Sequence, residues 1–188
     1  MPGYFGDPDK TAEAFDDEGY FITGDVMGFV DPTNMNKGLK FDGRISEDFK
    51  LLTGTWVRAA QLRLDLLGLL APLAADLVVT GADLDQLGLM IFPNMNGVQS
   101  NGFATDATKG ALTDRGLLAE VKNRLATHAQ AASSSTRVAR AIVLSDPPSM
   151  PEGEMTAKGN LNFRKILMRR TDMLVRLYDS DDPAVIIL

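Results

Sequence analysis

Apolar positions follow two different patterns along the chain. Up to residue 42 they are scattered between turn clusters rich in Asp, Pro, Gly and Asn. These clusters are Asp7-Pro8-Asp9, Asp16-Asp17-Glu18-Gly19 and Asp31-Pro32-Thr33-Asn34. The pattern predicts only a helical turn at 11–15 and short strands at 20–22 and 28–30. This segment has too little apolar surface to fold alone, so it is either a flexible leader or the end of a larger domain.

The stretch from Phe41 to Val57 separates the two patterns. It reads as an apolar strand, a polar break, a second strand and a turn that contains Gly54. From 38 to 57 we therefore predict two strands that form a β-hairpin-like unit. A helix is predicted next, at 58–71, where leucines recur at helical spacing and Pro72 should end or kink the helix. The leucines of this stripe are Leu62, Leu66, Leu69, Leu70 and Leu73.

Strand-like runs at 77–80 and 87–92 predict neighbouring antiparallel strands, and the Asn- and Gly-rich segment 93–110 predicts a loop. Thr113 is placed to cap a helix that runs to about residue 131.

The last part of the chain supplies one more strand and one more helix. The strand, at 138–144, is apolar on both faces, which predicts cover on both sides. A helix is predicted at 162–178, and the tail 184–188 would either add an edge strand or hang free. The order of elements predicts an α+β fold, with a small antiparallel or mixed sheet flanked by helices.

Composition and charge narrow the classes of function. The 188 residues include 19 basic and 25 acidic side chains, and the net charge of −6 argues against a nucleic acid or an anionic membrane as partner. The absence of cysteine excludes disulfides and makes a reducing cytoplasm the expected location. No apolar run reaches the roughly 20 residues of a membrane helix, and no signal-peptide pattern is present. His128 is the only histidine; we expect it to be a structural histidine with its hydrogen bonds satisfied, and we predict no metal site.

Four short motifs, in the expected order, resemble those of the AMP-forming acyl-CoA synthetases, the adenylate-forming ligase superfamily. Gly43-Arg44, with Lys50 and Gly54, resembles the hinge motif of that family. The other three motifs are Gly3-Tyr4 with Pro8, Thr11 and Phe15; then Tyr20–Asp25; and then Thr156–Arg164, which resembles a divergent C-terminal lysine motif. The run 49–57 is most similar to the feruloyl-CoA synthase branch.

The resemblance implies a domain organisation and a reaction. Residues 1–42 would end the large N-terminal AMP-binding domain, 43–46 would be the hinge, and 47–188 would be the C-terminal lid domain. The reaction would convert an acid, ATP and CoA into acyl-CoA, AMP and pyrophosphate, and an aromatic acid such as ferulate is the expected substrate. ATP or AMP, CoA and Mg²⁺ would be held mainly by the N-terminal domain, so the chain is expected to be inactive by itself.

The resemblance also assigns roles to residues around the hinge. Asp25 would accept hydrogen bonds from the AMP ribose, and Arg44 would bind nucleotide oxygens through its planar fork of donors. From the residues alone, Asp25 could instead cap its own turn, and Arg44 could form a surface ion pair with Asp42 or Glu47. Ser46 would be the pivot, where the family usually has Asp or Lys.

Lys50, Gly54 and Trp56 would belong to a loop that faces the active site in the thioester-forming half of the reaction. Gly54 would let the pantetheine arm approach the backbone closely, and Trp56 would line its tunnel. The alternatives are an exposed strand lysine at Lys50 and a core anchor at Trp56.

Lys158 is the catalytic candidate, because an ammonium can stabilise the charge that develops when a carboxylate attacks the α-phosphate. The family lysine usually follows its Gly directly, whereas here Asn160 follows Gly159. Arg164 and Lys165 are therefore alternative candidates. Without the family likeness, a lysine in such a loop would be solvated and inert. A non-catalytic α+β binding module derived from such a ligase, and a degenerate gene fragment, are the alternative interpretations of the whole chain.

Overall fold

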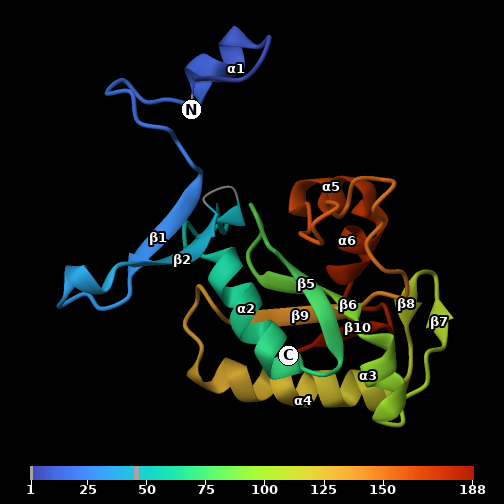
Figure 1. The fold of residues 1–188 in the computed structure, drawn as a ribbon. Coiled ribbons are helices and arrows are strands. Elements are labelled where there is room, and N and C mark those ends of the chain that lie inside the picture. Colours follow the sequence, from blue (N-terminus) through green and yellow to red (C-terminus); the bar gives the residue numbers. More distant parts are fainter. Residues whose placement is uncertain (1, 45–46) are drawn as a thin grey trace. The chain divides into compact units, whose positions relative to one another are not determined.

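The computed structural model describes residues 2–44 and 47–188, and the chain forms two compact units, Met1–Ser46 and Glu47–Leu188. The first unit contains helix α1 (Pro8–Glu13), strand β1 (Asp25–Phe29), the short 3-10 helix η1 (Met35–Lys37) and strand β2 (Leu39–Arg44). Figure 1 shows this unit in blue to cyan.

Two of the three turn clusters of the first unit supply helix caps. Asp7 Oδ1 accepts a hydrogen bond from Lys10 N at 3.0 Å at the start of α1, where Pro8 occupies the first helical position. Asn34 Oδ1 accepts from Asn36 N at 3.1 Å at the start of η1. The same residues that make this segment look like a series of turns therefore also begin its helices.

The strand pairing in this region differs from the prediction. The predicted strand at 28–30 lies instead at 25–29, and segment 20–22 contributes a single bridge, between Phe21 and Phe15. The predicted hairpin-like unit over 38–57 is wrong, because β2 pairs antiparallel with β1 rather than with the next strand. A period-2 pattern marks a strand but does not identify its partner.

No described side chain of the first unit is buried. Phe5 is fully exposed, and ten other large apolar side chains of this unit are at least 40% exposed. They are Tyr4, Tyr20, Phe21, Ile22, Met27, Phe29, Val30, Met35, Leu39 and Phe41. The described part of this unit therefore has no hydrophobic core of its own, as expected for so short and turn-rich a segment.

The second unit is built on a four-stranded sheet with the strand order β10-β9-β6-β5. The strands are β5 (Ala74–Thr80), β6 (Leu87–Pro93), β9 (Val138–Val143) and β10 (Val185–Ile187). The β5–β6 and β9–β10 pairs are antiparallel, whereas the central β6–β9 pair is parallel. The sheet is therefore mixed, and the tail forms an edge strand.

Helices cover both faces of this sheet, which makes three layers (Figure 1). On one face, α2 (Ala59–Leu70) and α4 (Arg115–Ala131) bury their leucine stripes against the sheet. On the other face, α5 (Phe163–Arg169) and α6 (Thr171–Leu177) pack on the alternate side chains of the same strands. The predicted cover on both sides of strand 138–144 is confirmed by its buried residues in both clusters.

Three details of the second unit differ from the prediction. The predicted loop 93–110 contains helix α3 (Met95–Ser100), which is capped by Asn94, and strand β7 (Ala107–Thr108), which pairs with β8 (Ala111–Leu112). The cap of α4 is Asp114 rather than Thr113, because Asp114 Oδ1 accepts from Leu117 N at 2.7 Å.

The predicted helix 162–178 is divided at Arg170 into α5 and α6. The hydroxyl of Thr171 donates to the carbonyl oxygens of Leu167 and Met168, at 3.2 and 3.0 Å. A side-chain hydroxyl that bonds to helical carbonyls competes with the backbone ladder, which gives a local reason for the break.

A small polar cluster ties α6 to the sheet. The Tyr178 hydroxyl lies 3.0 Å from the Thr80 hydroxyl and donates to the Gln86 carbonyl oxygen at 3.1 Å. Burial raises the pKa of Tyr178, although the Thr80 hydrogen bond and the nearby Arg140 charge partly oppose this. The tyrosine is therefore a neutral hydrogen-bonding group at neutral pH.

We expect Tyr178→Phe to lower the free energy of unfolding by about 1 kcal/mol, because buried Thr80 loses the hydrogen bond between its hydroxyl and that of Tyr178. Urea unfolding followed by circular dichroism measures this change. Tyr20→Phe, at an exposed position of the first unit, is the control and should leave the midpoint unaltered. Equal midpoints for Tyr178→Phe and the parent chain would contradict the assigned role of this cluster.

Candidate functional site

The first candidate region is the β1–β2 ladder, which brings two predicted site residues together. Asp25 begins β1 and is half-buried, and the antiparallel register pairs it with Arg44 at the end of β2. The backbone N–H of Asp25 donates to Thr23 Oγ1 at 3.1 Å, and Gly24 has a positive φ of 72°. The turn before β1 is therefore fixed locally by its own residues.

The rest of the hinge motif is only partly described. The backbone of Arg44 belongs to β2, but the side chains of 42–44 lie outside the described structure. Ser46, the predicted pivot, also lies outside the described residues. The roles of Asp25, Arg44 and Ser46 therefore stay predictions, and what the structure adds is the pairing of Asp25 with Arg44.

The second candidate region is the hairpin of β3 (Phe49–Lys50) and β4 (Trp56–Val57), in the second unit. Lys50 pairs with Trp56 in the register, and the Lys50 ammonium lies 5.5 Å from the centre of the Trp56 ring. Gly54 has φ of 81°, and its N–H donates to the Leu51 carbonyl oxygen at 2.8 Å. The turn therefore needs Gly54 for its conformation.

This hairpin is anchored in the core by Leu51 and Val57, not by its tryptophan. Trp56 is 51% exposed, so the alternative of a core anchor at Trp56 is wrong. Trp56 also lines a recess of about 230 Å³ between the hairpin, the start of α2 and the segment after α4. Its side chain is therefore available to a ligand, and that role stays a prediction.

The third candidate region is the loop that carries Lys158. A bridge between Met155 and Leu161 closes a small hairpin, and Thr156 N–H donates to the Asn160 carbonyl oxygen at 2.8 Å. Gly159 N–H donates to the Thr156 carbonyl oxygen at 2.9 Å. Lys158 is thus the third residue of a four-residue turn, at the exposed tip of this hairpin.

The geometry also accounts for the glycine that follows Lys158. Gly159 has φ of 83°, the left-handed conformation that such a turn requires at its last position. The hydroxyl of Thr156 accepts a hydrogen bond from Asn160 N at 3.1 Å, which fixes the other side of the turn. Arg164 and Lys165, the alternative candidates, lie exposed in the first turn of α5.

A buried ion pair at the base of this hairpin was missed by the sequence analysis. Glu154, only 2% exposed, accepts from Arg170 Nε at 3.0 Å and from Arg170 Nη2 at 2.7 Å. Its Oε2 also accepts from Ser149 N at 2.8 Å. Arg170 additionally donates to the carbonyl oxygens of Asp146 and Pro147, at 3.1 and 2.8 Å. We call Glu154 and Arg170 the brace.

The brace sets the ionisation of its carboxylate. Burial by itself raises the pKa of Glu154, but the hydrogen bonds from Arg170 and Ser149 and the charges of Arg170 and Arg169 outweigh it. The net effect is a pKa below the ordinary value, so Glu154 is ionised at neutral pH. The only sequence signal for this pair was a Glu just before the lysine motif and a double arginine in the following helix, which spacing alone cannot pair.

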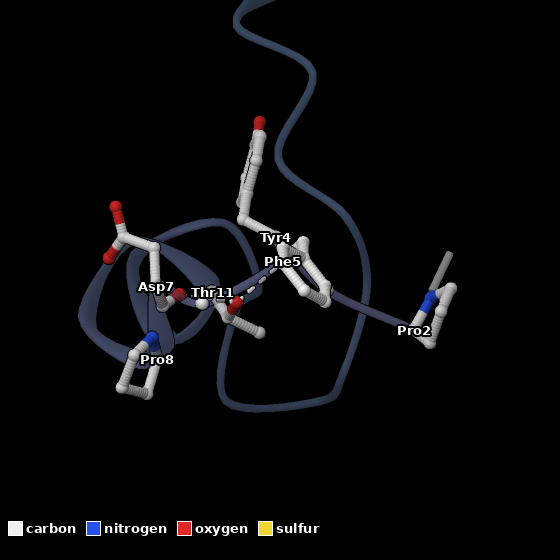
Figure 2. A pocket seen from close by; sticks show the side chains of 8 residues that line it. Pro2, Tyr4, Phe5, Asp7, Pro8 and Thr11 are labelled. Atoms are coloured by element: carbon white, nitrogen blue, oxygen red, sulfur yellow. Dashed lines mark hydrogen bonds between the residues drawn. The ribbon is translucent and has the colours of Figure 1, made fainter.

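Another recess lies in the first unit, with a volume of about 670 Å³ (Figure 2). The Tyr4 and Phe5 side chains stand at this recess, where Tyr4 N donates to Thr11 Oγ1 at 2.9 Å. The carboxylate of Asp7, which also lines the recess, caps α1. The Thr11 hydroxyl donates to the Asp7 carbonyl oxygen at 2.8 Å. These polar groups hold the turn together, so we assign no chemistry to this recess.

Two further expectations concern metal sites and histidine. Within residues 2–44 and 47–188, no group of three or more His, Cys, Asp or Glu side chains is arranged to hold a metal ion. His128 is half-buried on α4, and its Nδ1 has no hydrogen-bond partner in the described part of the chain, contrary to the expected fully paired histidine. None of the described helices has the length and apolarity needed to cross a membrane.

Comparison with known proteins identifies the fold. No protein-family model matches the chain. It is 24% identical to probable acyl-activating enzyme 16, chloroplastic, of Arabidopsis thaliana over 95% of this chain and 26% of that protein. It therefore spans about a quarter of the length of this curated relative.

Two solved structures have the same fold along almost the whole chain. One is the A domain of carboxylic acid reductase from Segniliparus rugosus, in complex with AMP and a co-purified carboxylic acid. It matches with a TM-score of 0.72 and 24% identity, over 94% of this chain and 26% of that one. The other is the anthranilate CoA ligase AuaEII in complex with anthranoyl-AMP, with a TM-score of 0.59 and 18% identity, over 93% and 28%. The chain therefore has the mixed α+β fold of the C-terminal portion of adenylate-forming enzymes, and it is similar to an acyl-activating enzyme and to the A domain of carboxylic acid reductase.

Proposed function

We propose that this chain is the C-terminal part of an AMP-forming acid–thiol ligase, in which 1–42 complete an AMP-binding domain and 47–188 form a mobile lid. In the first half of the reaction a carboxylate and ATP give an acyl-adenylate and pyrophosphate. In the second half a thiol, CoA, attacks the adenylate and releases AMP. The observation that carries the proposal is the pairing of Asp25 with Arg44 across the β1–β2 ladder.

This pairing suits the recognition of a nucleotide. Residues directly opposite in an antiparallel pair have Cα atoms about 4.5–5.5 Å apart, so the two backbone positions are close enough to serve one small ligand. The Asp25 carboxylate would accept hydrogen bonds from a ribose diol, and the Arg44 guanidinium would donate to ribose or phosphate oxygens. The apolar side chains exposed on the first unit support its assignment to a larger domain that covers them.

Lys158 would act in the first half of the reaction. At the tip of a short, internally hydrogen-bonded hairpin, its ammonium can extend into an active site while the loop keeps its shape. There it would hold the attacking carboxylate and stabilise the negative charge that develops on the α-phosphate. Mg²⁺ would neutralise the phosphates during this step, and the described residues offer no carboxylate cluster for it, so we assign it to the larger domain.

The β3–β4 hairpin would act in the second half, after the lid has rotated about the hinge at 43–46. The exposed Trp56 ring and the Gly54 turn would border the path of the pantetheine arm. We further propose an aromatic acid, such as ferulate, as the substrate, on the likeness of run 49–57 to the feruloyl-CoA synthase branch. The shared fold with an anthranilate CoA ligase supports an enzyme of this kind.

The test replaces the matching C-terminal quarter of the Segniliparus rugosus A domain by this chain, which gives a joined enzyme. We expect the joined enzyme to release pyrophosphate in the presence of a carboxylic acid and ATP, and the 188 residues alone to release none. Asp25→Ala in the joined enzyme should raise the KM for ATP about tenfold, because a charged hydrogen-bond acceptor is lost. Robust turnover by the isolated chain, or an unchanged KM, would contradict this assignment.

A further inference from the structure

The brace couples the Lys158 hairpin to the hydrophobic core through an unbroken series of contacts. The Arg170 guanidinium lies 4.9 Å from the centre of the Phe92 ring, a residue of β6 that is 1% exposed. Arg170 is itself the residue between α5 and α6, so its backbone position is set by both helices. Its side chain is 14% exposed and that of Glu154 is 2% exposed, so both charges are largely removed from water.

Glu154 connects the fixed Arg170 side chain to the backbone of the hairpin. It directly precedes Met155, whose bridge to Leu161 closes the hairpin. The carbonyl oxygen of Glu154 accepts from Asn162 N at 2.8 Å, so the brace residue spans both ends of the hairpin. Asn162 in turn caps α5, because its Oδ1 accepts from Lys165 N at 3.1 Å.

The approach to the hairpin is held by the same two side chains. Glu154 accepts from Ser149 N through its carboxylate, and Glu154 N donates to the Ser149 carbonyl oxygen at 2.9 Å. Arg170 donates hydrogen bonds to the carbonyl oxygens of Asp146 and Pro147. Every segment that enters or leaves the hairpin is therefore bonded to Glu154 or Arg170, and Lys158 is the exposed cation that this arrangement carries.

We infer that Glu154 and Arg170 are positioning residues for the adenylation half of the reaction, because they fix the hairpin that places the Lys158 ammonium. This inference rests on the proposed function. Neither side chain touches a reacting group; each acts through the backbone of the hairpin. A shift of about 1 Å in a catalytic group can lower a rate constant about a hundredfold, so a loosened hairpin should affect this half of the reaction first.

The first test measures amide hydrogen exchange on the full 188-residue chain. Glu154→Gln keeps the size of the side chain but removes its charge, and we expect Thr156 and Asn162 amides to exchange about tenfold faster or more. The amides of Leu89 and Ile142, in the sheet, should keep their protection and so show that the fold is intact. Arg170→Gln should give the same local result by removing the other member.

Asp182→Asn is the matched control for both variants. Asp182 accepts from Arg176 Nε at 2.7 Å and from Arg176 Nη2 at 3.2 Å, so it belongs to a similar carboxylate–arginine pair in the same unit. This pair joins α6 to the segment before β10 rather than to the hairpin. Its loss should leave hairpin exchange unchanged.

The second test uses the joined enzyme and separates the two half-reactions. Glu154→Gln should lower the adenylation rate constant about ten- to a hundredfold and leave the KM for ATP and the thioester half, started from supplied acyl-adenylate, unchanged. A purely structural role would lower both halves together. Asp182→Asn should change neither half.

The outcomes separate this inference from the proposed function. Faster hairpin exchange with selective loss of adenylation supports the positioning role. Unchanged exchange, or faster exchange with normal adenylation while Lys158→Ala is impaired, overturns it and leaves the proposed function intact. Normal adenylation in Lys158→Ala itself would remove both the catalytic lysine and the need to position it.

Discussion

Lys158→Ala is expected to lower the adenylation rate constant of the joined enzyme by about a hundred- to a thousandfold, the usual effect of removing one group that stabilises developing charge. The thioester half should keep its rate, because a different loop, the β3–β4 hairpin, is expected to face the active site in that half. Acid-dependent pyrophosphate release measures the first half, and acyl-thioester formation from supplied acyl-adenylate measures the second.

The matched controls for Lys158→Ala lie in α5, which begins directly after the Lys158 hairpin. Lys165→Ala removes an exposed cation from the first turn of α5, and Arg164→Ala removes its neighbour. A larger loss in either control than in Lys158→Ala would assign the catalytic cation to α5 instead. If none of the three variants affects either half-reaction, the chain is better described as a non-catalytic module with this fold.

The second large effect is expected at Glu154. Glu154→Ala should lower the free energy of unfolding of the 188-residue chain by about 3 kcal/mol or more, because breaking a buried pair leaves the Arg170 charge uncompensated. Urea unfolding followed by circular dichroism measures this loss. Glu152→Ala, in the same loop, is the control: Glu152 pairs with Arg169 but is 53% exposed, so its loss should cost at most about 1 kcal/mol.

The stabilisation by Glu154 should also depend on pH. Its pKa is lowered in the folded chain, so the contribution is fully present above the ordinary glutamate pKa of about 4.3. It should be lost as the pH falls through the lower pKa of the folded state. The stability difference between the parent chain and Glu154→Ala should therefore shrink in acid, and a difference that grows on acidification would contradict the assigned ionisation.

The sequence was sufficient to predict a helix or strand wherever the spacing of apolar residues alone decides the local structure. The leucine stripe of α2, the strand-like runs of β5 and β6 and the two-sided apolar run of β9 led to the observed elements, because burial selects these patterns directly. For the tail at 184–188 the sequence left two options, an edge strand or a free end, and the structure has the edge strand β10. The mixed fold class followed from the order of these elements.

Pairing between distant segments could not be read in the same way. Strand β2 was paired with the wrong neighbour because its own alternation fits either partner, and only the tertiary structure selects β1. The ion pair of the brace could not be predicted, because in the sequence Glu154 and Arg170 look like two ordinary surface charges in a polar stretch. The sequence left two options for Trp56, a tunnel-lining side chain or a core anchor, because tryptophan is usually buried; in the structure Leu51 and Val57 anchor the hairpin instead.

The parallel pairing of β6 with β9 has a consequence for the order of events during synthesis. An antiparallel neighbour, β5, is already present when β6 leaves the ribosome, but β9 follows only after α3, the β7–β8 pair and the long helix α4. Until then the inner edge of β6 presents unpaired N–H and carbonyl groups to any other nascent strand. Contacts this distant in sequence form slowly, so chains that end before Val138 should depend on chaperones and aggregate without them.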